Sequence, residues 1–133
     1  MGKRILVVDD NQDSLIIMRT ILQNHGYEVS VAGSGNEALD RLTRAAVDVV
    51  LLDVMMPDMN GFQVLQRIKE APATAQVPVI MVTAKTQDQD LIDGYQYGAD
   101  YYITKPFTAR QLLYGIELIL GKGASASGRS VES

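Results

Sequence analysis

The chain has 133 residues, with 12 basic and 16 acidic side chains and a formal net charge of −4 at pH 7. This length suits one domain that buries its own core. The absence of cysteine excludes disulfides and thiolate metal sites, and the single histidine excludes a polyhistidine zinc site. No apolar run is long enough for a membrane span, and net acidity without a basic cluster argues against direct nucleic-acid binding. We therefore expect a soluble, cytoplasmic protein.

In chain order, residues 4–8 form an apolar run rich in β-branched side chains, which predicts a strand. Asn11 can then cap a helix whose apolar residues recur at helical spacing as far as Gly26. His25 stands at the expected end of this helix, where a histidine is favourably placed near the negative end of the helix dipole. This position favours a structural His25 over the base of a serine–histidine–aspartate triad.

A second strand is expected over residues 28–32 and a third, strongly apolar strand over residues 47–52. Between them, Ser34 and Glu37 have the spacing of a capping box, which predicts the start of a helix. After the third strand, Asn60 can cap a further amphipathic helix.

The fourth strand is expected over residues 77–82, with its proline near the start, where a missing donor is tolerated. A weaker helical pattern covers 87–97, and a short fifth strand covers 100–103. Thr108 and Gln111 form a second capping box before the last helix. Five strands alternating with five helices predict an α/β fold with an open, doubly wound parallel sheet, because a closed barrel of this kind needs eight units.

Ligands of such sheets bind beyond the carboxyl ends of the strands. Those ends carry Asp9 and Asp10, Asp53, Thr83 and Lys105. Three carboxylates in one crevice repel one another unless a proton or a cation intervenes, and oxygen-only ligands favour Mg²⁺. A lysine and a hydroxyl beside them suit a phosphoryl group. The set therefore predicts phosphoryl transfer, with a carboxylate available as the nucleophile.

Each of these residues alone also has an ordinary structural explanation. Paired aspartates after a strand are common in turns and caps, a threonine suits a strand, and a lysine suits the surface. A chance origin is much less probable for the whole set, because every member falls at the correct end of its strand.

Four segments together resemble the response regulator receiver domain, the CheY-like phosphoacceptor of two-component signalling. They read ILVVDDN, VVLLDVMMPDMNGFQVL, VPVIMVTAK and GADYYITKPF. The resemblance covers about residues 3–122 and implies a flavodoxin-like (βα)5 sheet with strand order 2-1-3-4-5. We expect residues 1–122 to form the receiver domain and 123–133, rich in glycine and serine, to be a flexible tail or a truncated linker.

The resemblance implies that Asp53 accepts a phosphoryl group from a histidine kinase or a histidine phosphotransfer protein. It implies direct Mg²⁺ binding by Asp10 and Asp53, with Asp9 acting through water. The backbone carbonyl of Met55 would complete the protein ligands, and Lys105 would pair with the phosphoryl oxygens. The chain would then catalyse its own Mg²⁺-dependent phosphorylation without being a metabolic enzyme.

The resemblance also implies a switch. Thr83 would hydrogen-bond the phosphoryl group, and Tyr102 would turn inward with it. The face formed by the fourth helix, the fifth strand and the last helix would change, altering the binding of a downstream protein or an attached output domain. The Lys105–Pro106 peptide is expected to be cis, which proline makes accessible.

Two features depart from the commonest pattern of the family. Met55 and Lys85 are neither acids nor amides able to orient a water, so slow self-dephosphorylation is expected. The expected output face carries an apolar and aromatic patch in place of much of the charge ladder that supports dimers in the winged-helix subfamily. The patch is either a partner surface or ordinary packing, and its residues are Leu91, Tyr95, Tyr101 and Tyr114.

Two other classes of function compete with the receiver. A haloacid-dehalogenase-type phosphatase also uses an aspartyl nucleophile, but it expects a DxD motif, whereas strand one here ends in Asp9-Asp10-Asn11 and no capping insertion is visible. A phosphorylation-independent pseudo-receiver is disfavoured because the site residues are all present.

Overall fold

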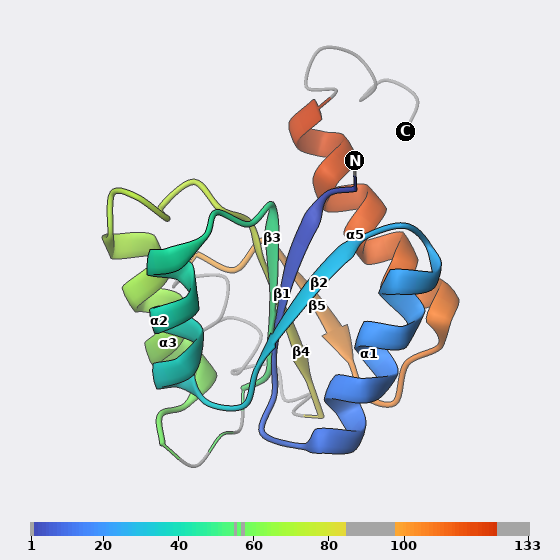
Figure 1. Cartoon of the computed structure of the whole chain (residues 1–133), viewed down its shortest axis with the longest axis horizontal. Coiled ribbons are helices and arrows are strands. Elements are labelled where there is room, and N and C mark those ends of the chain that lie inside the picture. The colour runs from blue at the N-terminus through green and yellow to red at the C-terminus, as the bar shows by residue number, and fades with distance from the viewer. Residues whose placement is uncertain (1, 55, 57, 85–97, 125–133) are drawn as a thin grey trace.

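The computed structural model describes residues 2–54, 56, 58–84 and 98–124 (Figure 1). The strands are β1 (Arg4–Val8), β2 (Glu28–Ala32), β3 (Val49–Leu52), β4 (Val79–Thr83) and β5 (Tyr101–Thr104). The described helices are α1 (Gln12–Asn24), α2 (Gly35–Arg44), α3 (Gly61–Glu70) and α5 (Ala109–Ala124). The five strands form one parallel sheet in the order β2-β1-β3-β4-β5, which confirms the expected fold class and strand order. The helix expected over 87–97 lies outside the described residues.

The sheet separates two apolar cores. Helices α1 and α5 lie on one side of it, and α2 and α3 lie on the other (Figure 1). The strands β1 and β3 are buried on both faces, so Leu6 and Leu52 pack on the α2–α3 side while Ile5 and Leu51 pack on the α1–α5 side. This two-sided burial explains the near-continuous apolar runs in the sequence. Within the described part of the chain, no helix combines the length and the apolar character needed to cross a bilayer.

The third and fourth strands begin later than the sequence predicts. Asp48 donates its backbone N–H to the carbonyl of Arg4 at 2.7 Å, and its carboxylate accepts from the N–H of Arg4 at 2.7 Å. Val77 donates to Thr74 at 3.0 Å in a turn. Polar and turn contacts therefore hold residues that hydrophobicity alone assigns to strands.

Side-chain caps fix the starts of the helices. Asn11 caps α1 by accepting from the N–H of Ser14 at 2.9 Å. Asn60 and Gln63 form a reciprocal capping box at α3, with bonds of 3.0 and 3.1 Å. The expected capping box of Thr108 and Gln111 is also present, with bonds of 2.9 and 3.0 Å. These bonds satisfy backbone donors that a helix leaves unpaired at its first turn.

The cap of α2 differs in part from the expected capping box. Ser34 accepts from the N–H of Glu37 at 3.1 Å, as predicted. The Glu37 carboxylate accepts from the N–H of Gly33 at 2.9 Å, one residue before the N-cap, so the reciprocal bond is displaced.

The end of α1 confirms the structural role of His25. His25 is the C-cap residue, and its Nδ1 lies 3.2 Å from the carbonyl oxygen of Ile21. Gly26 follows with a φ of +88°, a conformation that glycine adopts without strain.

Candidate functional site

The three predicted carboxylates lie together at the carboxyl edge of the sheet. Asp9 follows β1 and Asp53 follows β3, which are neighbouring strands. Their backbones continue the ladder, because Asp53 donates its N–H to Val8 at 3.0 Å. One carboxylate oxygen from each of Asp9, Asp10 and Asp53 lies within 4.8 Å of the other two.

The three carboxylates differ in their surroundings. Asp9 and Asp53 are only 1% and 6% exposed, whereas Asp10 is exposed to solvent. The Asp9 carboxylate accepts from the N–H of Asn11 at 3.0 Å and from the Nζ of Lys105 at 2.7 Å. The same Nζ lies 3.7 Å from Oδ1 of Asp53. Lys105 is therefore paired tightly with Asp9 and more loosely with Asp53.

The electrostatics of Asp53 indicate a pocket with too much negative charge. Burial, reinforced by the nearby charge of Asp9 and then of Asp10, raises the pKa of Asp53 to about 6. The charge of Lys105 acts in the opposite direction but does not offset these effects. A bound divalent cation would supply the missing positive charge, and the all-oxygen donor set fits Mg²⁺.

Lys105 reaches the site from the far edge strand. It follows β5, and the Lys105–Pro106 peptide is cis, as expected. Thr83 is the last residue of β4 and pairs in register with Thr104, so its backbone lies at the same carboxyl edge. Met55 and Lys85 lie outside the described residues.

A glycine allows α3 to begin against the backbone of the candidate acceptor. Gly61 donates its N–H to the carbonyl of Val54 at 2.7 Å. A Cβ at Gly61 would collide with the carbonyl oxygen of Asp53 and would lie 2.8 Å from the Cα of Val54. The loop after Asp53 therefore returns close to its own start, and only glycine fits there.

Sequence reasoning assigned no role to Asp58. Its carboxylate accepts from the N–H groups of Gly35 and Asn36, 23 and 22 residues earlier in the chain. The sequence offered no local signal for this bond, because Gly35 follows β2 and Asp58 follows β3, and the two segments meet only through the strand order of the sheet.

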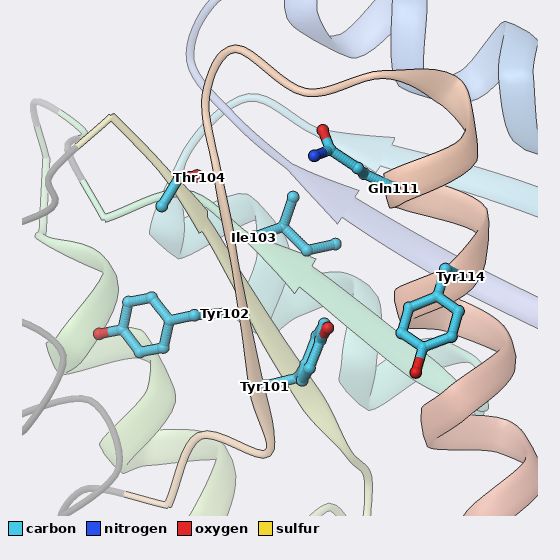
Figure 2. Close-up of a pocket in the computed structure, with 6 residues that line it drawn as sticks. All are labelled: Tyr101, Tyr102, Ile103, Thr104, Gln111 and Tyr114. Carbon is cyan, nitrogen blue, oxygen red and sulfur yellow. The ribbon is translucent and has the colours of Figure 1, made fainter.

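The two faces of β5 carry different tyrosines. Figure 2 shows Tyr101 on the side of α5 and Tyr102 directed away from it. Tyr102 is partly buried and packs against the core under α2 and α3. Tyr101 and Tyr114 line a pocket of about 170 Å³, and Tyr114 is 58% exposed. The other patch residues, Leu91 and Tyr95, lie outside the described residues.

Comparison with known proteins decides the family. Residues 5–117 match the response regulator receiver domain. The chain belongs to this family. Among curated relatives, the regulatory protein VanRc of Enterococcus gallinarum is 42% identical over 85% of this chain and 48% of its own length. The sensory transduction protein RegX3 of Mycolicibacterium smegmatis is 39% identical over 90% of this chain and 51% of its own length. The chain thus spans about half the length of these relatives.

Solved structures agree with this assignment. A CheY-like receiver domain protein from Methanospirillum hungatei matches with a TM-score of 0.89 and 31% identity, over 96% of this chain and 100% of that one. The phosphorylated cyanobacterial phytochrome response regulator RcpA matches with a TM-score of 0.80 and 26% identity, over 96% and 98% of the two chains. The receiver domain is a signalling module of two-component systems, in which it interacts with histidine kinases, and it is not a metabolic enzyme.

Proposed function

We propose that this receiver domain is a phosphorylation-activated switch and that Asp53 is its phosphoacceptor. The observation that carries the proposal is the buried Asp53 carboxylate, grouped with those of Asp9 and Asp10 and 3.7 Å from the Nζ of Lys105. This combination of a nucleophile, a cation site and a fixed positive charge suits phosphoryl transfer. A receiver of the same fold has been crystallised in its phosphorylated form.

In the proposed reaction, an ionised oxygen of Asp53 attacks the phosphorus of a phosphohistidine or a small phosphodonor. The bond from phosphorus to the leaving nitrogen or oxygen breaks, and the leaving group keeps the electron pair. Bound Mg²⁺, held by Asp10 and Asp53 with Asp9 acting through water and the Met55 carbonyl completing the ligands, would neutralise charge on the phosphoryl oxygens. Lys105 pairs with one of those oxygens, and its existing bond to Asp9 holds the ammonium at the correct edge.

The proposed output follows from the new charge. A phosphoryl group adds nearly two negative charges and strong acceptor oxygens to Asp53. The Thr83 hydroxyl donates to the phosphoryl group, and Tyr102 moves into the space that Thr83 leaves. The face formed by the fourth helix, β5 and α5 then favours a different partner, which shifts the population of the two states.

We further propose that residues 1–122 form the receiver unit and that 123–133 form a tail or a linker to an effector. The phosphodonor is a sensor histidine kinase or a histidine phosphotransfer protein. The domain acts in the cytoplasm and does not itself bind nucleic acid. These proposals rest on the family and, for nucleic acid, on the net charge of −4.

The test is incubation with acetyl phosphate or phosphoramidate and Mg²⁺, followed by intact mass measurement. We expect the added mass of one phosphoryl group on the wild type, lost on treatment with hydroxylamine as an acyl phosphate should be. Asp53→Asn should gain no such mass, whereas the control Asp13→Asn, altered on α1 outside the carboxylate cluster, should behave as wild type. Turnover of many phosphomonoesters would instead favour a phosphatase, and the absence of any adduct would favour a pseudo-receiver.

A further inference from the structure

The first turn of α2 is capped from two different parts of the chain. A helix leaves its first N–H groups without partners inside the helix. The side chain of Ser34, the residue before α2, accepts from the N–H of Glu37 at 3.1 Å. The N–H groups of Gly35 and Asn36 donate instead to the two carboxylate oxygens of Asp58, at 3.1 and 3.0 Å. Asp58 therefore completes the cap from the loop between β3 and α3.

The same loop also packs against that turn. A Cβ on Gly35 would lie 2.8 Å from Cγ of Met59 and 2.8 Å from Cγ2 of Val64, so the glycine permits a close apolar contact beside the Asp58 bonds. The N–H groups of Asn36 and Gly35 lower the pKa of Asp58, so its carboxylate stays ionised and its bonds to the positive end of α2 are charge-assisted.

This loop is the one that follows the candidate acceptor. It leaves β3 at Asp53 and is closed at its far end by the bond from Gly61 to Val54. Met55, whose carbonyl is a proposed cation ligand, precedes Asp58 by three residues in the sequence. A link in the middle of the loop can therefore restrict the positions available to that ligand, in the way that partners of metal ligands fix them elsewhere.

We propose that Asp58 is a positioning residue for the phosphoryl site: by tying the loop after Asp53 to the first turn of α2, it holds that loop in the arrangement that binds the cation. The inference rests on the proposed function, and within it on the cation site formed by Asp9, Asp10 and Asp53. Asp58 touches neither the cation nor the phosphoryl group, and it acts only through the loop.

The test compares a graded series with a matched control. Asp58→Asn keeps one acceptor oxygen and Asp58→Ala keeps none. Ser34→Ala removes a bond to the same turn of α2 but leaves the link to the loop intact. Two quantities are measured on each folded variant: the Mg²⁺ dissociation constant by titration, and the hydrogen-exchange rate of the Gly61 amide without metal.

We expect Asp58→Ala to raise the Mg²⁺ dissociation constant about three- to tenfold, below the usual effect of a direct partner of a metal ligand. Its Gly61 amide should exchange faster, and Asp58→Asn should fall between it and wild type. Ser34→Ala should lower the melting temperature to a similar extent yet leave both quantities near wild type. If Asp58→Ala fails to fold, the comparison of Asp58→Asn with Ser34→Ala decides.

An unchanged Mg²⁺ dissociation constant in a folded Asp58 variant would overturn the inference. An equal rise of that constant in Ser34→Ala would also overturn it, because fraying of α2 would then explain the effect. Neither measurement requires phosphorylation. A wild type that binds Mg²⁺ but forms no acyl phosphate therefore rejects the proposed acceptor and leaves the role of Asp58 in cation binding standing. A wild type that binds no Mg²⁺ rejects both proposals before any variant is made.

Discussion

Replacing Asp53 with asparagine should stabilise the metal-free protein at neutral pH. The folded state raises the pKa of Asp53 from 3.8 to about 6. The folded state therefore holds its proton more tightly than the unfolded chain, and this favourable contribution is present in full below pH 3.8. It is lost as the pH rises through about 6, because the charged form is then buried beside Asp9 and Asp10.

The magnitude follows from the difference between the two pKa values. Each pKa unit is worth about 1.4 kcal/mol, so the folded state becomes less stable by about 3 kcal/mol once Asp53 is fully ionised. Asparagine is similar in shape and uncharged, so it escapes this cost. Asp53→Asn should therefore gain stability over wild type progressively between about pH 4 and pH 7 and then remain at a plateau.

The assay is urea unfolding of wild type and variant in EDTA at several pH values. Asp58→Asn serves as the control with the opposite sign, since backbone N–H groups lower the pKa of Asp58 and its carboxylate stabilises the fold above its ordinary pKa. That variant should lose stability at neutral pH, and the loss should disappear on acidification. The reasoning would be refuted if the difference in unfolding free energy between Asp53→Asn and wild type did not depend on pH. It would also be refuted if that difference became smaller as the pH rises.

Three further predictions concern the loop, the switch and the phosphoryl lifetime. Gly61→Ala should lower the free energy of unfolding by about 2 kcal/mol or more, because the added Cβ would collide with backbone atoms. The control Gly33→Ala, whose Cβ would meet only the end of a side chain at 3.7 Å, should be about as stable as wild type. Equal losses of stability in the two variants, measured by chemical unfolding, would contradict this. Thr83→Ala should still gain a phosphoryl group but lose phosphorylation-dependent partner affinity, measured by titration with the partner; retained affinity would show that the signal takes another route. Met55→Asn combined with Lys85→Glu should speed loss of the acyl phosphate, followed by mass over time, and an unchanged rate would count against slow self-hydrolysis as a property of those two positions.

The sequence alone was sufficient to predict the fold and to predict that the site residues lie close together. Alternating apolar runs and helical spacings indicate a parallel sheet, and the rule that ligands bind at carboxyl ends then brings Asp9, Asp10 and Asp53 together. The structure confirms that grouping and the position of Lys105 beside it. The individual roles of these residues in catalysis stay predictions.

The features that could not be predicted from the sequence depend on contacts between segments that are distant in the chain. Asp48 lies near the start of the run over residues 47–52 that is predicted to be a strand, yet its carboxylate accepts from the N–H of Arg4, and β3 begins only at Val49. Asp58 caps a helix that begins 23 residues earlier, and no local pattern reports such a pairing. Local chemistry thus predicts elements well, whereas side chains that connect elements become visible only once the sheet order is known.

The ion pair of Lys105 with Asp9 joins positions 96 residues apart, from the loop after the edge strand β5 to the end of β1. Two strands, β3 and β4, lie between them in the sheet. The pocket is consequently incomplete until nearly the entire domain has been synthesised and its last βα unit has docked. A nascent or truncated chain that ends before Lys105 could form the earlier strands and still lack the positive charge of the pocket. A contact between positions so far apart in the sequence can form only after the intervening chain is ordered, so we expect the Lys105–Asp9 ion pair to form late in folding.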